Sequence, residues 1–125
     1  MLKRKKFTTV RWKSKNTYRT GIWAEYYAAF RLVIRGYYIL NFRYKTKVGE
    51  VDIIAKKGHI IAFIEVKYRQ SLDDGVSAIS LKSRSRIRRA SEHFILGKQT
   101  ESHTLRFDVI AINNKLKMRH IENAF

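Results

Sequence analysis

Residues 49–69 constrain the fold of this chain more than any other segment. Their sequence is GEVDIIAKKGHIIAFIEVKYR, in which two apolar runs rich in β-branched and aromatic residues are separated by Lys57-Gly58. Residues of these types favour β-strands, and a glycine between the runs supplies the positive φ that a short hairpin turn requires. The segment therefore predicts a β-hairpin.

Three charged residues of this segment are expected on one face of the hairpin. A two- or four-residue loop pairs even positions of the first strand with odd positions of the second, and side chains alternate along each strand. Asp52 therefore shares a face with Glu65 and Lys67, and the two carboxylates lie roughly 5 to 8 Å apart at Cβ. The same alternation predicts that Glu65 and Lys67 face solvent and that Val66 faces the core.

Two carboxylates beside an ammonium group are the residue types that metal-assisted phosphodiester cleavage needs. Mg²⁺ prefers oxygen ligands and accepts one or two carboxylates together with waters and substrate phosphates. The metal lowers the pKa of a bound water, and a neighbouring lysine neutralises the negative charge that develops on the phosphate. The pattern alone also fits an ordinary amphipathic hairpin whose polar face meets solvent, so both interpretations stay open at this point.

The charge of the chain points to a polyanionic partner. Lysine and arginine number 27 against 10 aspartate and glutamate residues, which gives a net charge of +17 on 125 residues. Such a field favours nucleic acid as the partner, although it selects no activity. An anionic membrane surface is the alternative, and it is disfavoured because no long basic helix with a bulky apolar face stands out.

Length and composition predict a single cytoplasmic domain. A chain of 125 residues with 45% hydrophobic content can bury one core. The absence of cysteine excludes a disulfide framework and a thiolate zinc site. The longest apolar run, residues 60–64, is far shorter than a membrane span, and no apolar segment follows the basic run at residues 3–6, so we expect no secretory signal. We expect a basic N-terminal arm over residues 1–20 and one domain over residues 21–125.

Periodicity predicts two helices. The first begins at Gly21 and ends at Gly36, a glycine in the position that commonly terminates a helix. The second is expected over residues 77–96, after a loop at residues 70–75. The apolar residues that recur at helical spacing in the first helix are Ile22, Tyr26, Ala29, Phe30 and Val33. The predicted buried stripe of the second helix is Ile87, Ala90, Ser91 and Phe94.

Strands fill the remaining segments. One is expected over residues 37–44, before the hairpin strands at residues 48–55 and 60–66. After the second helix, a strongly apolar strand over residues 105–112 leads into a two-residue turn at Asn113-Asn114 and an edge strand over residues 116–121. The predicted order is α-β-β-β-α-β with one terminal strand added.

This order of elements resembles the restriction-endonuclease-like core, whose signature is an aspartate and then, on the same β-hairpin, an acidic residue one position away from a lysine. Four motifs resemble the YraN family more closely. They are GEVDIIA at residues 49–55, EVKYR at 65–69, RFDVI at 106–110 and HIENAF at 120–125. That family consists of small bacterial proteins predicted to be endonucleases and distantly similar to archaeal Holliday-junction resolvases. The resemblance implies an α/β fold with a mixed sheet flanked by helices.

The resemblance also implies roles for individual residues. Asp52 and Glu65 would bind Mg²⁺ or Mn²⁺, Lys67 would be the catalytic lysine, and the main-chain carbonyl of Val66 would add a ligand. Glu25 falls where related resolvases carry a glutamate on the first helix that completes the catalytic metal site. Because those resolvases act as dimers on two-fold junctions, the resemblance implies a homodimer as well.

A second set of residues is expected to contact nucleic acid. The second predicted helix carries many basic residues with few acidic neighbours, which favours a phosphate-contacting surface over a merely solvated face. Tyr68 and Arg69 lie just beyond the predicted metal site and are further candidates, although they fit ordinary surface positions equally well. The basic candidates on the helix are Lys82, Arg84, Arg86 and Arg89.

Two other kinds of residue receive a structural interpretation. Asp108 interrupts an apolar strand, and we expect it to belong to a buried hydrogen-bond network. The four histidines lack the spacing of metal ligands, so a histidine metal site is not expected.

Together these observations predict a metal-dependent endonuclease that hydrolyses phosphodiester bonds in DNA. The alternative from another class is a non-catalytic nucleic-acid-binding module that keeps the fold and the charge. A third is a scaffold for a DNA-processing partner with a vestigial acidic site, and the joint presence of Asp52, Glu65 and Lys67 argues against it. The sequence does not select among branched DNA, flaps, DNA ends and RNA as substrate.

Overall fold

The computed structural model describes residues 21–70, 72 and 79–125. The predicted basic arm at residues 1–20 and most of the predicted loop at 70–75 lie outside the described residues. Residues 21–34 form a helical segment, and six further elements follow it along the chain. These are β1 (Tyr38–Lys45), β2 (Glu50–Lys57), β3 (Ile60–Tyr68), α3 (Leu81–Ile95), β4 (Thr104–Ile112) and β5 (Met118–Ile121).

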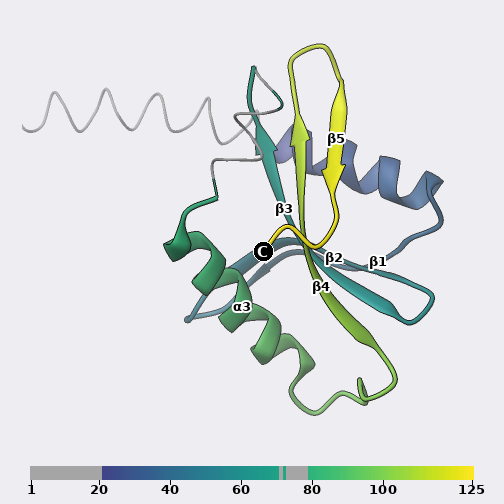
Figure 1. Ribbon diagram of the computed structural model, residues 1–125, viewed down its shortest axis with the longest axis vertical. Coiled ribbons are helices and arrows are strands. Elements are labelled where there is room, and N and C mark those ends of the chain that lie inside the picture. The colour runs from purple at the N-terminus through teal and green to yellow at the C-terminus, as the bar shows by residue number, and fades with distance from the viewer. Residues whose placement is uncertain (1–20, 71, 73–78) are drawn as a thin grey trace, which may run out of the picture.

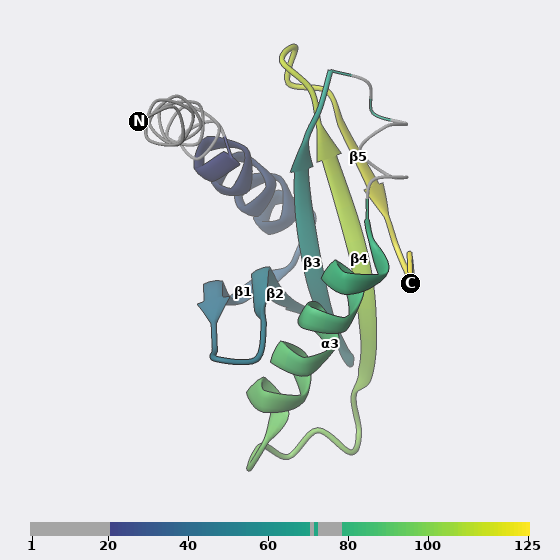
Figure 2. The same cartoon turned by 90° about the vertical axis from the view of Figure 1, so that its left-hand side faces the viewer.

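The five strands form one mixed sheet in the order β1-β2-β3-β4-β5. β3 pairs parallel with β4, whereas the other neighbours pair antiparallel. Parallel pairing of consecutive strands requires a crossover connection, and α3 supplies it on one face of the sheet. The helical segment 21–34 lies on the opposite face (Figures 1 and 2). The predicted α/β class, order of elements and mixed sheet are confirmed.

The sheet separates two hydrophobic cores. The core under the helical segment contains small and branched side chains from that helix and from three strands, together with Tyr37: Ala24, Ala28, Leu32, Tyr37, Ile53, Ala55, Ala62, Ile64, Ile110 and Ile112. The core under α3 contains Val51, Ile54, Ile61, Phe63, Ile87, Ala90 and Phe94. Both faces of β3 are therefore buried, as the continuous apolar sequence of a strand covered on both faces requires.

The helix ends follow their local sequence. Gly36 has a φ of 94°, and its N–H donates to the carbonyl of Val33 while Tyr37 N–H donates to that of Leu32, both at 3.0 Å. This pair of bonds is the Schellman arrangement that a glycine after the helix permits. At the start of α3, the Ser80 hydroxyl accepts a hydrogen bond of 3.1 Å from Ser83 N–H, which satisfies a main-chain donor of the first turn.

The predicted stripes of the two helices have different outcomes. In α3 the buried residues are Ile87, Ala90, Ser91 and Phe94, as predicted. In the helical segment 21–34 the helix itself is confirmed, but the buried residues are Ala24, Ala28 and Leu32, while Tyr26, Phe30 and Val33 are exposed. Of the apolar residues that predicted this helix, Ala29 packs partly against the core, while Tyr26, Phe30 and Val33 face outward.

Two turns differ in their agreement with prediction. The β2–β3 turn contains Gly58 and His59, and Gly58 has the positive φ, 60°, expected of it. The predicted two-residue turn at Asn113-Asn114 is wrong, because the connection runs through residues 113–117. The Asn113 side-chain oxygen accepts hydrogen bonds of 3.0 Å from the N–H groups of Lys115 and Lys117, which stabilises the longer loop.

Among the described residues, none of the helices combines the length and the apolarity needed to cross a membrane.

Gly49 sets the distance between α3 and the sheet. It is buried immediately before β2, and a Cβ atom added there would lie 1.9 Å from the main-chain oxygen of Arg86 in α3. Since real Cβ contacts do not approach this closely and the opposing atom belongs to a helix backbone, only glycine permits the observed packing. Gly49 lies three residues before Asp52. The close packing of α3 on Gly49 therefore also positions the strand residues that lead into the predicted metal site.

We expect Gly49→Ala to lower the free energy of unfolding by about 3 kcal/mol, because α3 must move away from β2 to admit the methyl group. Urea unfolding measures this change. Gly21→Ala is the matched control: an added Cβ there meets open space within a helical segment, so stability should hold or rise by up to about 1 kcal/mol. A Gly49→Ala variant that unfolds at the wild-type midpoint would contradict the close approach.

Candidate active site

The β2–β3 hairpin brings the two predicted carboxylate ligands together. Ile53 pairs with Ile64, and continuing this antiparallel register by one residue places Asp52 opposite Glu65. Glu65 and Lys67 follow each other on the same side of β3, and Lys67 Nζ lies 3.9 Å from Glu65 Oε1. The structure therefore assembles all three residues of the predicted signature at one place, while their catalytic roles stay predictions.

Asp52 is held in place by the strand opposite. Its Oδ2 atom accepts a hydrogen bond of 2.8 Å from the main-chain N–H of Val66, the residue between Glu65 and Lys67. One oxygen of the carboxylate is thereby fixed against β3. The main-chain carbonyl of Val66, which the resemblance implies as a further ligand, belongs to this same residue.

The predicted solvent-facing position of Glu65 and Lys67 is wrong. Their side chains are only 18% and 20% exposed. The predicted alternation of side chains along the hairpin is correct. The predicted exposure is wrong because it required one face of the sheet to meet solvent, whereas a helix covers each face of this sheet. The acidic group of Glu65 therefore lies in a largely desolvated environment.

Burial and repulsion raise the pKa of two carboxyl groups. Burial is the largest cause of a Glu65 pKa of about 9, followed by the charge of Asp52 and a hydrogen bond that protonated Glu65 donates to it, with Lys67 opposing the shift. Burial also raises the pKa of Glu25 to about 7; Asp52 contributes to the rise and Arg43 opposes it. In each case the pKa rises because the ionised carboxylate is destabilised by burial and by another acidic group nearby.

Glu25 reaches the same region from the helical segment 21–34. Its Oε1 atom lies 3.8 Å from Arg43 Nη1 of β1 and, within the described residues, is buried without a hydrogen bond. Arg43 itself has a φ of 58°, a left-handed conformation that is uncommon away from glycine. A cavity of about 380 Å³ lies between the helical segment 21–34, β1 and β2. It is lined by Gly21, Glu25, Arg43, Lys45, Glu50, Val51 and Asp52.

The donor set fits a hard divalent cation in its chemistry. Asp52 and Glu65 offer carboxylate oxygens, and a cation between them would offset both the burial and the repulsion that raise the pKa of Glu65. The described part of the chain contains no preformed group of three or more histidine, cysteine or acidic side chains at metal-binding distances. The pair Asp52 and Glu65 is thus the centre of the candidate metal site, and Glu25 is the nearby acid that faces Arg43 instead.

The predicted nucleic-acid contacts lie mainly on the exposed side of α3. Lys82, Arg86 and Arg89 are exposed, whereas Arg84 is half-buried and its guanidinium lies 5.9 Å from the centre of the Phe125 ring. Arg88, another basic residue of the same helix, lies 4.6 Å from the centre of the Phe107 ring. The rings of Phe107 on β4 and of the C-terminal Phe125 thus orient two arginines of α3.

The remaining two nucleic-acid candidates follow β3. Tyr68 packs partly against the core under the helical segment. Arg69 is exposed and donates a hydrogen bond of 2.8 Å to the Tyr68 carbonyl. Of this pair, Arg69 therefore has the side chain more available to a ligand.

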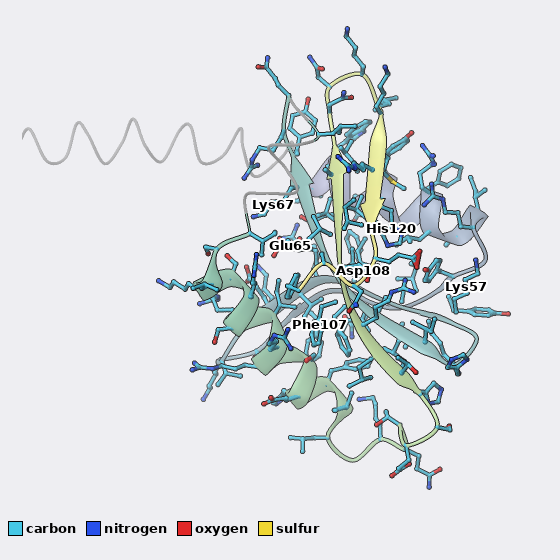
Figure 3. All side chains as sticks on the ribbon, viewed as in Figure 1. Lys57, Glu65, Lys67, Phe107, Asp108 and His120 are labelled. Atoms are coloured by element: carbon cyan, nitrogen blue, oxygen red, sulfur yellow. The ribbon has the colours of Figure 1, made fainter. Side chains whose placement is uncertain are left out.

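Asp108 belongs to a separate cluster with a structural role. It is fully buried on β4 and accepts hydrogen bonds from Arg106, from His120 Nε2 at 2.8 Å and from Asn123 N–H at 3.0 Å. Burial alone would raise the pKa of Asp108, but these hydrogen bonds outweigh it and hold the pKa below its ordinary value. Figure 3 shows Asp108 and His120 together, apart from Glu65 and Lys67.

The partners of Asp108 were present in the sequence motifs without being recognised as partners. Arg106 Nη2 also donates a 2.7 Å hydrogen bond to the Tyr37 hydroxyl, and Arg106 Nη1 forms a 2.8 Å ion pair with Glu122. The alternation of Arg106 with Asp108 on one strand was the available signal, because residues two apart share a face. This network ties β4, β5 and the segment after the first helix together.

Fold and site together define a class of protein. The chain is an α/β domain with a restriction-endonuclease-like core, a mixed five-stranded sheet between a helical segment and α3. It belongs to the YraN family, whose description is uncharacterised protein family UPF0102 and whose sequence profile matches residues 24–112.

Several bacterial relatives share most of the chain. A UPF0102 protein of Sinorhizobium medicae is 44% identical over 109 residues, which cover 86% of this chain and 88% of the relative. One from Agrobacterium fabrum is 40% identical over 114 residues, covering 90% and 93%. One from Bradyrhizobium diazoefficiens is 41% identical over 109 residues, covering 86% and 82%. The names of these relatives state the family alone.

The raised pKa values predict how stability depends on pH without metal. Glu65 and Glu25 have folded-state pKa values of about 9 and about 7 against an ordinary 4.5, so the folded protein keeps protons that the unfolded chain releases. The free energy of unfolding should therefore fall as the pH rises from about 5 to about 9. Glu65→Gln should flatten this decline.

Urea unfolding at pH 5, 7 and 9 in the presence of a chelator measures the decline. Glu101→Gln, at an exposed glutamate before β4, is the control and should keep the wild-type pH dependence. An equal decline in wild type and Glu65→Gln would show that Glu65 is not the group responsible.

Proposed function

We propose that this protein is a metal-dependent endonuclease that hydrolyses phosphodiester bonds in DNA. The observation that carries the proposal is the close placement of Asp52, Glu65 and Lys67, in which burial and then the neighbouring charge of Asp52 raise the pKa of Glu65. Such clusters of perturbed acids lower stability and recur at functional sites. The family resemblance and the net charge of +17 support the same reaction and the same substrate class.

Each residue would have a defined part in the reaction. Asp52 and Glu65 would bind Mg²⁺ or Mn²⁺, with the Val66 carbonyl and Glu25 as further ligands. The bound ion would lower the pKa of a water and offset charge on the scissile phosphate. The hydrogen bond from Val66 N–H to Asp52 fixes the direction of one ligand before substrate arrives, which reduces the reorganisation needed for catalysis.

Lys67 supplies a cation at the point where charge develops. Its ammonium lies beside Glu65 in a poorly solvated environment, where its field acts on the phosphate more strongly than it would in water. Hydrolysis adds water across one P–O bond, leaving a phosphate monoester and a free hydroxyl. Lys45 lines the cavity beside Asp52 and would attract the phosphate groups of the strand being cut.

A non-catalytic nucleic-acid-binding module is the second candidate. It is favoured by one observation, that Glu25 faces Arg43 at 3.8 Å instead of completing a three-acid group with Asp52 and Glu65. In that case the cavity would bind phosphate through its cations without turnover. Variants of the acidic and basic residues distinguish the two functions.

We expect Lys67→Ala to reduce cleavage at least about 100-fold and to leave DNA affinity within a few-fold, because its ammonium acts mainly on the transition state. Glu65→Ala should abolish cleavage and the binding of Mn²⁺, and it should leave metal-free DNA binding within a few-fold, because burial and Asp52 keep Glu65 protonated near neutral pH without metal. The assay is a screen of branched, single-stranded and duplex DNA, and of RNA, with Mg²⁺ or Mn²⁺, alongside calorimetry of Mn²⁺ binding.

The control in this screen is Lys117→Ala, an exposed lysine in the β4–β5 connection, which should cleave as wild type does. If the wild-type protein cleaves no substrate, or if Lys67→Ala cleaves equally well, the binding module replaces the nuclease.

DNA binding itself should depend steeply on salt and little on sequence, because phosphate contacts release counterions with a log–log slope of about −0.9 per contact. Charge reversal of Arg86 and Arg89 together should weaken binding and make the slope shallower by about 2. Reversal of Lys115 and Lys117, which changes the net charge equally at exposed positions away from α3, should have a smaller effect. Filter binding at several salt concentrations measures both, and equal effects would exclude α3 as the main contact surface.

A further inference from the structure

The helical segment 21–34 presents an apolar face that no described part of the chain covers. In Figure 2 this segment lies on one side of the sheet and α3 lies on the other. Five large side chains occupy that side. Their exposures are 48% for Trp23, 61% for Tyr26, 61% for Phe30, 55% for Val33 and 66% for Ile34.

These side chains contribute little to the core of their own chain. The helix packs on the sheet through Ala24, Ala28 and Leu32, which lie on the opposite side of the helical cylinder from Phe30. The outer side chains are instead ordered among themselves and against the edge strand. The Trp23 and Tyr27 rings stack with an interplanar angle of 1°, and Tyr26 stacks on Phe42 of β1 at 4.7 Å between ring centres.

The size of this face matches one half of a protein interface. Aromatic side chains bury about 150–250 Å² each, so at the observed exposures the five side chains present roughly 500 Å² of apolar surface. Two such faces would bury about 1,000 Å², the lower end of the range for a specific protein interface. A contiguous exposed apolar patch of this size on a small protein indicates a partner.

Charge selects a second copy of the chain over nucleic acid or lipid. Single-stranded nucleic acid and anionic membranes are bound by aromatic side chains interleaved with available cations. Within the helical segment 21–34 the single basic residue is Arg31, whose guanidinium donates a 2.9 Å hydrogen bond to the Tyr27 hydroxyl and lies over the Tyr27 ring. Two copies that each carry +17 repel one another least where they meet through an uncharged surface.

We propose that the outer face of the helical segment 21–34 is the interface of a homodimer, in which the face formed by Trp23, Tyr26, Phe30, Val33 and Ile34 packs on the same face of a second copy. Such an interface is self-complementary about a two-fold axis, and aromatic residues at its centre supply most of the affinity. The proposal does not rest on nuclease activity. It places the two copies of Glu25 on paired helices and so holds two candidate sites in one assembly.

Sedimentation equilibrium of the full chain, without DNA, tests the proposal. The wild-type protein should be a dimer at micromolar concentration. Phe30→Asp should weaken the dimer by more than about 30-fold, because a hot-spot aromatic is lost and two like charges meet at the axis. Leu81→Asp is the matched control: it changes charge equally at a leucine that is 80% exposed on α3, and the dimer should persist. Circular dichroism checks that both variants fold.

Cysteine cross-linking provides a second measurement, since the chain has no native cysteine. Under mild oxidation, Phe30→Cys should form a disulfide-linked dimer rapidly, and Leu81→Cys should not. Three results would overturn the proposal. One is a monomeric wild type at about 100 µM. Another is a Phe30→Asp protein that stays dimeric. The third is a monomer whose binding to anionic vesicles or to single-stranded DNA is lost in Phe30→Asp and kept in Leu81→Asp.

Discussion

The pairing of β3 with two different neighbours is the constraint on which the rest of the structure depends. β3 is antiparallel to β2 through a two-residue turn and parallel to β4 through a crossover. A hairpin needs only a turn, whereas a parallel pair needs a crossover connection, and here α3 lies in that connection and covers one face of the sheet. The other face is left for the helical segment 21–34. Because both faces of β3 are covered, any charged residue on this strand is drawn out of water.

The two buried acidic residues Asp108 and Glu65 differ in the groups that surround them, and their pKa values shift in opposite directions. Asp108 is fully buried, and cationic and main-chain donors surround it and lower its pKa. Glu65 lies against another carboxylate, and its pKa rises to about 9. The first arrangement stabilises the fold, as buried charges with complete hydrogen bonding do. The second costs stability unless a cation or a proton is present, and no packing requirement of the hairpin explains it.

Much of the fold was predictable because it follows from local rules. The hairpin, the stripe of α3 and the glycine after the first helix each depend on periodicity or on a positive φ within a few residues. The wrong predictions depended on distant parts of the chain. The solvent exposure of Glu65 could not be read from β3 alone, because helices elsewhere in the sequence decide it. The longer β4–β5 turn depended on the Asn113 side chain bonding to two main-chain groups.

The candidate site was predictable to a similar degree. The alternation of side chains across the hairpin was sufficient to predict that Asp52, Glu65 and Lys67 lie close together. Glu25 entered only through the family resemblance, because no spacing rule links a residue of the first helix to β2. Its contact with Arg43 depends on an irregular backbone conformation of β1, which cannot be predicted from the sequence of that strand.

The two sides of the helical segment 21–34 carry side chains of different size, for different physical reasons. Ala24 and Ala28 are small, so the helix backbone can lie close to the sheet, and this closeness allows the short reach of Glu25 to bring its charge near Asp52. Bulky residues on that side would lift the helix and withdraw the carboxylate. The large aromatic residues therefore could not serve the inner core, and their place on the outer side calls for a reason beyond the fold of one chain. A partner that covers them supplies that reason, because it turns exposed apolar surface into buried surface without disturbing the inner contacts.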